Sequence, residues 1–432
     1  MPDFIRTPKE RELLARAGKA LPGGTLGNVR MAEEHAFIVA EGRGSRIRDV
    51  SGNEYIDYLL GSGPMVLGHA HPKVIAAAAA AMAKGTTFFA QNAYAVELAE
   101  RIIEAMPCAE QVRFTSSGTE ATYNALKLAR AFRKRDKILK FEGGFHGMHD
   151  YSQMSLSPTG EIALPRPEPS SAGIPKVVQE TVLVAPFNDL NAVADLLDRY
   201  HDELAAVIVE PVQRVIEPQP GFLQGLRELT ERYGVLLIFD EVVTGFRLAY
   251  GGAQEHYGVT PDIAAVGKII GGGFPLAGIV GRRDVMEHFD AKSVAASDFV
   301  PQVGTLSGNP VAAAAGIATL EALREPGVYD AYHARANRLR TTLQRLFNEA
   351  ETPAVVSGVD MMFDVYFTEQ PVVDYRSTLV DKTLNQVFDN TLLEHGVFKS
   401  AGKTYVGVCH TDEDIDHTID AYKAAVTAVR EA

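Results

Sequence analysis

The sequence has no tryptophan, only two cysteines and no long hydrophobic run. Cys108 and Cys409 cannot form a disulfide framework, which favours a reducing compartment. The longest apolar run, Val74–Ala83, is about half the roughly twenty residues that a membrane-spanning helix needs. Residues 1–20 mix charges throughout and contain no apolar stretch typical of a secretory signal. From these absences we expect a cytoplasmic protein without a membrane segment.

The charge balance is acidic, with a formal net charge of −13 and no cluster of basic residues. This balance argues against binding to nucleic acid through its phosphates. The chain has 432 residues, of which 46% are hydrophobic and 22% charged, as in ordinary globular proteins. Such a chain is long enough for a large core and a second, smaller lobe.

Short apolar runs alternate with helical patterns through the middle of the chain. Four runs predict buried strands: Val182–Ala185, Ala205–Val209, Val235–Phe239 and Ile263–Val266. Helical stretches such as Leu190–Tyr200 and Leu223–Tyr233 lie between them. This alternation predicts an α/β fold with a mostly parallel sheet flanked by helices, which binds ligands at the carboxyl ends of its strands.

The two ends of the chain have different patterns. Residues Arg43–Leu60, with a turn at Ser51–Asn53, predict a hairpin. Thr411 and Asp414 have capping-box spacing at the start of a helix with an apolar stripe. We therefore expect a large domain over residues 61–310 and a smaller one from residues 311–432, joined by the N-terminal segment and hairpin at residues 1–60.

The segment Ser155–Lys176 contains five prolines, so neither a helix nor a strand is expected to run through it. A long loop of this kind is either a surface linker or a mobile loop at an active site. We favour the active-site loop because the segment follows the motif-rich residues 141–150.

A glycine-containing turn at Ser116–Glu120 joins the run Val112–Phe114, which predicts a strand, to a helix that begins near Thr119. Such a turn leaves unpaired backbone N–H groups at the positive end of the helix dipole, where phosphate binds well. The alternative is a plain helix cap, since Ser117 and Glu120 have capping-box spacing. The chain has no G-x-x-x-x-G-K-[ST] motif, so a P-loop is excluded.

Two ionisable residues follow predicted buried strands. The carboxylate of Asp240, after Val235–Phe239, either caps a helix or pairs with a cationic ring nitrogen. Lys268 follows Ile263–Val266 and is either a surface lysine or a desolvated amine that reacts with a carbonyl carbon. A phosphate site, a carboxylate for a ring nitrogen and a reactive amine are what pyridoxal 5′-phosphate requires.

These motifs belong to a longer series that runs in order along nearly the whole chain. The segments are Pro22–Arg30, Gly63–Pro72, Ser116–Ala121, Lys140–Gly147, Phe239–Gly252, Gly267–Gly278 and Gly304–Pro310. On these residues the chain resembles the class III, fold-type I, pyridoxal-phosphate-dependent aminotransferases, and most closely their glutamate-1-semialdehyde 2,1-aminomutase branch. The resemblance implies a large domain with a mostly parallel sheet, a smaller α+β domain, and a homodimer with active sites at the subunit interface.

By position, the resemblance also implies roles for individual residues. Lys268 would form a Schiff base with the cofactor and carry a proton, and Asp240 would pair with the pyridine nitrogen. Ser117, Gly118 and Thr119 would bind the phosphate together with Thr305 of the partner subunit. Val242 and Phe145 would lie on the two faces of the ring, with His146 beside them. Glu210 and Gln213 would lie near the ring hydroxyl.

Two histidine pairs have an alternative interpretation as metal ligands. They are His69 with His71, and His146 with His149 beside Asp150. Neither pair has cysteine companions, and each lies in a segment that the resemblance explains without a metal. We therefore expect no metal site.

The substrate side departs from the aminomutase pattern. That pattern has serine, tryptophan, tyrosine and glutamate at or near Gly27, Ser62, Phe145 and Gly402. Arg30 is retained and is a candidate for binding a substrate carboxylate. Arg214, where relatives often carry a small residue, is a second candidate.

Intact cofactor residues with an altered substrate side predict an aminotransferase that acts on a small-molecule amine or amino acid and a keto acid or aldehyde. One alternative is a true glutamate-1-semialdehyde 2,1-aminomutase, which moves the amine within one molecule. A second is an amino-acid racemase or epimerase on the same fold. A catalytically silent binding protein is disfavoured because Lys268 and Asp240 are both present.

Overall fold

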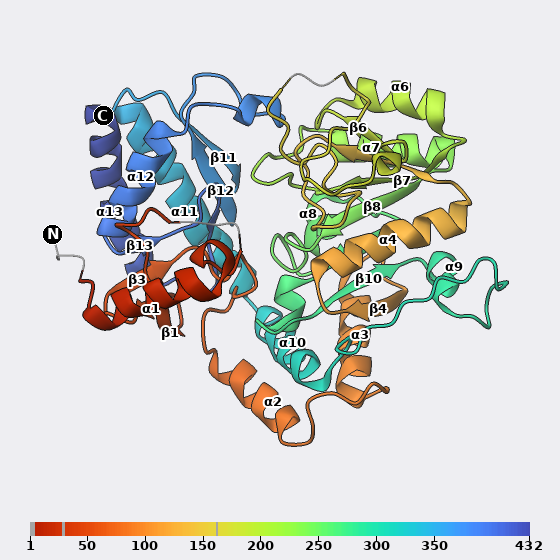
Figure 1. The fold of residues 1–432 in the computed structure, drawn as a ribbon, viewed down its shortest axis with the longest axis horizontal. Coiled ribbons are helices and arrows are strands. Elements are labelled where there is room, and N and C mark those ends of the chain that lie inside the picture. The colour runs from red at the N-terminus through yellow and green to blue at the C-terminus, as the bar shows by residue number, and fades with distance from the viewer. Residues whose placement is uncertain (1–4, 28–30, 161–162) are drawn as a thin grey trace. The chain divides into compact units, whose positions relative to one another are not determined.

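The computed structural model describes residues 5–27, 31–160 and 163–432, and the chain divides into two compact units (Figure 1). Unit 1 comprises the chain up to His71 together with Asp330–Gln370 and Val380–Ala432. Unit 2 comprises Pro72–Tyr329 and the short segment Pro371–Leu379. This short segment therefore belongs to unit 2, although unit 1 residues flank it on both sides.

Unit 2 is built on a seven-stranded sheet. In spatial order its strands are β4 (Gln111–Thr115), β10 (Ala277–Gly281), β9 (Ile263–Val266), β8 (Leu236–Glu241), β7 (Leu204–Val209), β5 (Lys137–Phe141) and β6 (Val182–Ala185). The five strands from β9 to β6 are parallel to their neighbours. Strand β10 is antiparallel to both β9 and β4, so β4 again runs in the common direction.

The predicted α/β class with a mostly parallel sheet is confirmed. The four predicted strands are β6, β7, β8 and β9, and the predicted helices are α6 (Leu190–Tyr200) and α7 (Phe222–Tyr233). Strand β8 continues beyond the predicted end because Asp240 and Glu241 still pair with Ala265 and Val266 of β9. The predicted strand ends at Phe239, because the next two side chains are polar and do not extend the apolar run.

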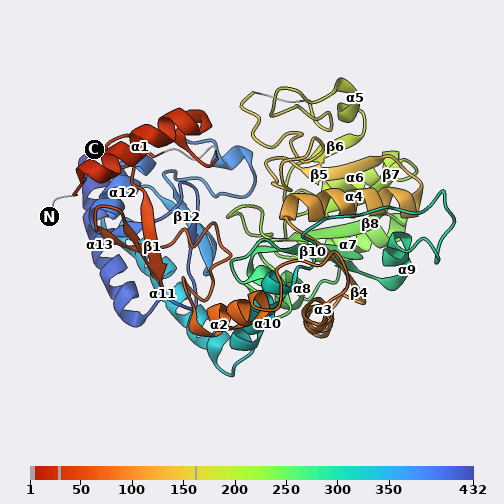
Figure 2. The same cartoon turned by 60° about the horizontal axis from the view of Figure 1, so that its bottom comes forward.

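Helices cover the sheet of unit 2. All residues of β7, β8 and β10 are buried, as expected for strands covered on both faces. Helix α4 (Gly118–Arg133) packs on the sheet through Ala121, Ala125 and Leu128 (Figure 2).

A group of apolar helices supports the same unit. Helix α10 (Pro310–Leu323) is buried almost all round because α2 (Pro72–Met82), α3 (Ala93–Ala105) and the turn η2 (Lys268–Gly271) pack on it. Figures 1 and 2 both show α2 beside α10. The remaining short elements of unit 2 are α5 (Lys176–Gln179), α8 (Gly252–Tyr257), α9 (Arg283–Met286), η3 (Glu287–Phe289) and η4 (Arg376–Thr378).

Unit 1 contains two small sheets and several helices. The sheets are β1 (Val39–Arg43), β2 (Arg46–Asp49), β3 (Glu54–Asp57) and β13 (Val397–Phe398), and β11 (Val355–Val359), β12 (Met362–Tyr366) and β14 (Thr404–Tyr405). The helices are α1 (Pro8–Ala20), η1 (Pro22–Gly24), α12 (Thr383–Glu394) and α13 (Asp412–Glu431), with α11 (Val328–Glu349) beginning in unit 2.

Three local predictions are confirmed. Strands β2 and β3 form the expected antiparallel hairpin. At the start of α13, Thr411 and Asp414 form a reciprocal capping box. Between Ser155 and Pro175 the described residues contain no helix or strand.

Within the described ranges, none of the helices combines the length and apolar character that crossing a membrane requires.

Candidate active site at the carboxyl edge of the sheet

Six strands of unit 2 end along one edge of the sheet, because β4, β5, β6, β7, β8 and β9 run in the same direction. The segments that follow them carry most of the residues predicted to bind a cofactor. They are Ser116–Gly118, residues 142–149 (the Phe145 loop), residues 210–216, Val242, and Gly267 with Lys268. Ligands of parallel sheets bind at this edge.

The carboxylate of Asp240 is buried at the end of β8, with 5% of its side chain exposed. Its Oδ1 accepts a hydrogen bond from the backbone N–H of Val242 at 3.1 Å, and its Oδ2 lies 2.9 Å from His146 Nδ1. Burial lowers the pKa of His146 to about 3, so the imidazole is neutral and donates from Nδ1. A neutral donor orients the carboxylate without neutralising its charge.

The Phe145 loop is attached to the end of β7. The backbone N–H of Phe145 donates to Glu210 Oε2 at 2.7 Å. Two buried atoms next to this contact, His146 Nε2 and Gln213 Oε1, have no hydrogen-bond partner among the described residues. Both face Gly144, since a Cβ atom there would lie 3.2 Å from the first and 3.3 Å from the second. Buried polar atoms without partners indicate a place where a ligand or water completes the hydrogen bonds.

A buried lysine binds a backbone carbonyl group of the same loop. Lys140, which is fully buried, donates from Nζ to the carbonyl oxygen of Gly144 at 3.1 Å and to those of Ser152 and Met154. Burial, followed by the charge of Arg214, lowers the pKa of Lys140 to about 7. No local pattern distinguishes Lys140 from a surface lysine, because its burial arises from the surrounding loops.

Arg214 lies beside the ring of Phe145. Its guanidinium carbon is 4.9 Å from the ring centroid, a cation–π distance, and its Nε donates to the carbonyl oxygen of Gly143 at 3.2 Å. Its backbone has a left-handed φ of 61°. A non-glycine residue in this conformation is strained and often functional. The structure therefore brings Arg214 to the predicted cofactor-binding residues.

The predicted phosphate-binding turn also meets this edge. Ser117 caps α4 by accepting from the backbone N–H of Glu120, and its side chain is exposed. A Cβ atom on Gly118 would lie 2.9 Å from Val242 Cγ1, and one on Gly267 would lie 3.3 Å from the same atom. Gly118, Val242 and Gly267 are thus in close contact, and larger residues do not fit at Gly118 without a shift. Thr119 Oγ1 accepts from the backbone N–H of Met148 in the Phe145 loop at 3.2 Å.

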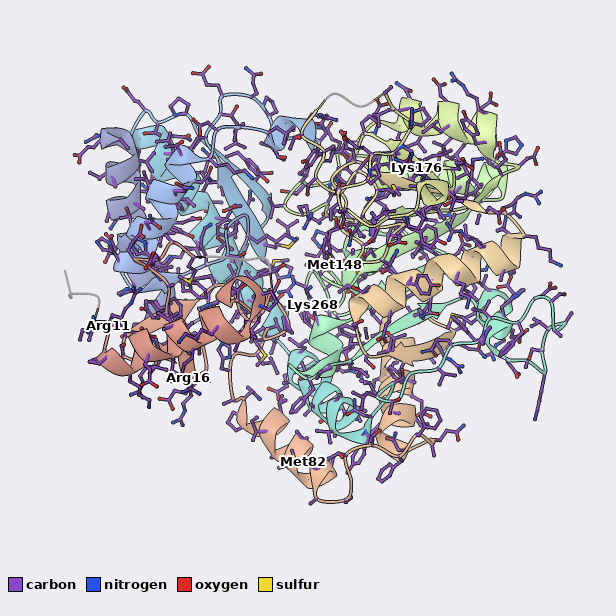
Figure 3. All side chains as sticks on the ribbon, in the orientation of Figure 1. Arg11, Arg16, Met82, Met148, Lys176 and Lys268 are labelled. Atoms are coloured by element: carbon purple, nitrogen blue, oxygen red, sulfur yellow. The ribbon has the colours of Figure 1, made fainter. Side chains whose placement is uncertain are left out.

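Lys268 opens the turn η2 directly after β9 and is half-buried (labelled in Figure 3). Its φ is 50°, a left-handed conformation that a lysine adopts only when the surrounding structure imposes it. Helix α10 supplies that constraint, because a Cβ atom on its Gly316 would lie only 2.1 Å from the carbonyl oxygen of Ile270. The backbone of α10 therefore lies directly against the turn that carries Lys268.

One predicted residue, Thr305, is not joined to this group. Thr305 is exposed and lines a separate cavity of about 420 Å³, whose described lining residues do not include Ser117, Gly118 or Thr119. Arg30 lies outside the described residues.

The histidine pairs have other contacts. His69 Nε2 lies 2.7 Å from Asp57 Oδ2, and His149 Nε2 lies 3.4 Å from Thr122 Oγ1. In the part of the chain that the structure describes, no group of three or more His, Cys, Asp or Glu residues could hold a metal ion.

Comparisons with known proteins agree with this geometry. The family model of the class III aminotransferases matches residues 29–426. The chain is 44% identical over 423 residues to a glutamate-1-semialdehyde 2,1-aminomutase of Desulfitobacterium hafniense (strain Y51), covering 95% of this chain and 96% of the relative. Its structure is similar to an omega-transaminase from Sphaerobacter thermophilus, with a TM-score of 0.92, 34% identity and 98% of both chains covered. A transaminase with bound pyridoxal phosphate gives a TM-score of 0.89, 31% identity and 99% coverage of both chains.

Proposed function

Because the chain belongs to the class III aminotransferases, which depend on pyridoxal 5′-phosphate, we propose that it transfers an amino group between two molecules. The donor is an amine or amino acid, and the acceptor is a keto acid or aldehyde. The observation that carries this proposal is Arg214, whose guanidinium lies over Phe145 beside the residues predicted to bind the cofactor. An arginine at this place suits a second substrate with a carboxylate, such as a keto acid.

The residues at the sheet edge fit pyridoxal phosphate. The first turn of α4 offers backbone N–H groups to a phosphate, and Asp240 offers a buried carboxylate to a cationic ring nitrogen. Gln213 Oε1 is a buried acceptor that lacks a donor among the described residues, and a ring hydroxyl supplies one. Gly118 and Gly267 pack closely against Val242 and so fix the side chain that is predicted to contact one face of the ring.

Each residue then has a role in the transfer. When bound, the cofactor supplies an electrophilic carbon and an electron sink. Lys268 Nζ would bind this carbon and, once released, would move a proton at the substrate carbon. Asp240, oriented by Val242 and His146, would keep a proton on the ring nitrogen. Phe145 would exclude water from one side of the cofactor.

An intramolecular aminomutase is the second candidate, and the 44% identity to curated enzymes of that name favours it. Both reactions use the same cofactor residues, so those residues do not separate them. The two differ in whether a keto acid is consumed. A racemase or epimerase has no such support among these relatives.

Wild-type enzyme supplied with an amine donor and a keto acid should consume both and release equal amounts of the aminated acid and the deaminated donor. Lys268→Ala should abolish turnover, because no other amine replaces Nζ, while its circular dichroism stays that of the wild type. Lys292→Ala, at an exposed position, serves as the control. Product formed from glutamate-1-semialdehyde without any keto acid would establish the aminomutase instead.

Asp240→Asn should keep the cofactor bound and lower kcat by about a hundredfold or more. The phosphate contacts are unaffected, whereas the ring nitrogen loses the charge that keeps it protonated. Bound cofactor is measured by absorbance, and kcat is measured with both the amine donor and the keto acid at saturating concentration. Asp284→Asn, which alters an exposed ion pair with Arg282, is the control. A kcat near the wild-type value would reduce Asp240 to a structural residue.

Arg214→Met should lower kcat/KM for 3-amino-3-phenylpropanoate by roughly ten- to a hundredfold, the effect of losing a charged hydrogen bond of about 1.5–3 kcal/mol. The carboxylate-free analogue 1-phenylpropylamine should be nearly unaffected. Arg30→Met, tested on the same pair, decides between the two candidate arginines. Equal losses on both amines would show that Arg214 only supports the Phe145 loop.

We also propose that the enzyme is a homodimer that joins Thr305 to the phosphate site of the other copy. Phe88, Phe89 and Val303, with 52%, 70% and 78% of their surface exposed, line the cavity that contains Thr305. Exposed apolar side chains gathered in this way are typical of a protein interface.

Phe89→Asp combined with Val303→Asp should yield monomers of about 46.8 kDa, whereas the wild type should have twice that mass by analytical ultracentrifugation. The monomer should also bind the cofactor more weakly, because Thr305 no longer reaches the phosphate. Val177→Asp, at another exposed apolar position, should remain dimeric. A monomeric wild type with full activity would contradict the proposal.

A further inference from the structure

The short segment Pro371–Leu379, called the strap here, is the only part of unit 2 that comes from the chain between Asp330 and the C-terminus. Its own hydrogen bonds make it rigid: the backbone N–H groups of Val373 and Asp374 donate to Ser377 Oγ, and Asp374 Oδ1 accepts from the backbone N–H of Ser377. Asn188 Nδ2 fastens it to unit 2 by donating to the carbonyl oxygen of Val373 at 2.8 Å.

Arg376 on the strap makes three hydrogen bonds. Its Nε donates to Glu142 Oε2 at 2.9 Å and its Nη2 to Glu142 Oε1 at 2.5 Å, which is a two-pronged ion pair. Its Nη1 donates to the carbonyl oxygen of Gly160 at 2.7 Å. Glu142 is the first residue of the Phe145 loop, and Gly160 lies in the proline-containing segment Ser155–Lys176. One guanidinium therefore joins two loops.

The position of this ion pair makes it more than a surface contact. The Glu142 side chain is only 3% exposed, and removing one partner of a buried ion pair is strongly destabilising. Beside it, the ring of Tyr375 covers Gly143 so closely that a Cβ atom there would lie 2.2 Å from Tyr375 Cδ2. The hydroxyl of Tyr375 donates to the carbonyl oxygen of Pro158 at 3.0 Å. The strap thus contacts the first two residues of the Phe145 loop and the proline-containing segment together.

Other residues hold the Phe145 loop from elsewhere in unit 2. Gln213 Nε2 donates to the carbonyl oxygen of Glu142 at 2.8 Å. Arg214, Lys140 and Glu210 then bind Gly143, Gly144 and Phe145, in that order. These contacts hold the loop mainly by its backbone. The Glu142 carboxylate is the side-chain contact that the strap adds.

We propose that Arg376 is a positioning residue that fixes the Phe145 loop through Glu142 and couples it to the segment Ser155–Lys176 through Gly160. Its effect on catalysis rests on the proposed place of Phe145 against the cofactor. Its effect on the loop does not, because the contacts are made by residues of the chain itself. A lysine at this position cannot make the two-pronged contact.

Hydrogen–deuterium exchange of the ligand-free and cofactor-loaded protein tests the loop directly. In Arg376→Gln and in Glu142→Gln, exchange over residues 142–149 should become faster while the strands of the sheet keep wild-type protection. The control is Arg324→Gln, which breaks a comparable two-pronged pair with Glu104 at an exposed place in unit 2 and should leave residues 142–149 unchanged. Unchanged exchange in the Arg376 variant, or faster exchange spread evenly over unit 2, would overturn the proposal.

Kinetics and spectroscopy test the catalytic consequence. Arg376→Gln should lower kcat by roughly ten- to a hundredfold, as for a group displaced by about one ångström, and weaken the visible circular dichroism of the bound cofactor. Arg376→Lys should recover part of both, and the double variant with Glu142→Gln should be no worse than either single variant, since both remove one interaction. A wild-type kcat together with wild-type cofactor dichroism in Arg376→Gln would overturn the proposed effect of Arg376 on catalysis. The dichroism needs no substrate, so this result is distinct from a failure of the amine-transfer assays.

Discussion

Asp240 places a negative charge inside unit 2 at the end of β8, and a buried charge is costly unless it is paired. The structure meets this constraint with one backbone donor, from Val242, and one neutral imidazole, from His146. Because His146 belongs to the Phe145 loop, orienting the carboxylate also fixes that loop. The position of Phe145 is thereby tied to the carboxylate that we propose pairs with the cofactor ring.

The Phe145 loop is defined by residues that are far apart in the sequence. Lys140 comes before it, Glu210, Gln213 and Arg214 follow β7, and the strap with Arg376 lies near the C-terminal part of the chain. Each contributes one or two hydrogen bonds of about 1 kcal/mol or somewhat more where a charge is involved. Their combined effect is geometric: a loop held at successive residues has few conformations left to it.

The family identity and the substrate are determined by different parts of the site. The residues for the cofactor match the class III pattern, and the relatives with that pattern include both aminomutases and transaminases. Arg214 brings a positive charge close to Lys140 and His146; burial lowers the pKa of both groups, and the charge of Arg214 lowers them further. A cation that acts on two neighbours in a buried site also attracts an anionic substrate group.

The sequence by itself determined the parallel sheet, the hairpin, the capped C-terminal helix, and the candidate residues Asp240, Lys268, Ser117 and Phe145. These depend on local periodicity and on motifs that stand directly after strands, and such signals are contiguous in the chain. Only the tertiary structure decided that Lys140 is buried, that His146 pairs with Asp240, and that Arg376 reaches Glu142. These contacts join residues separated by up to 234 positions in the chain. A local sequence pattern does not indicate which distant side chain will bind a given buried polar group.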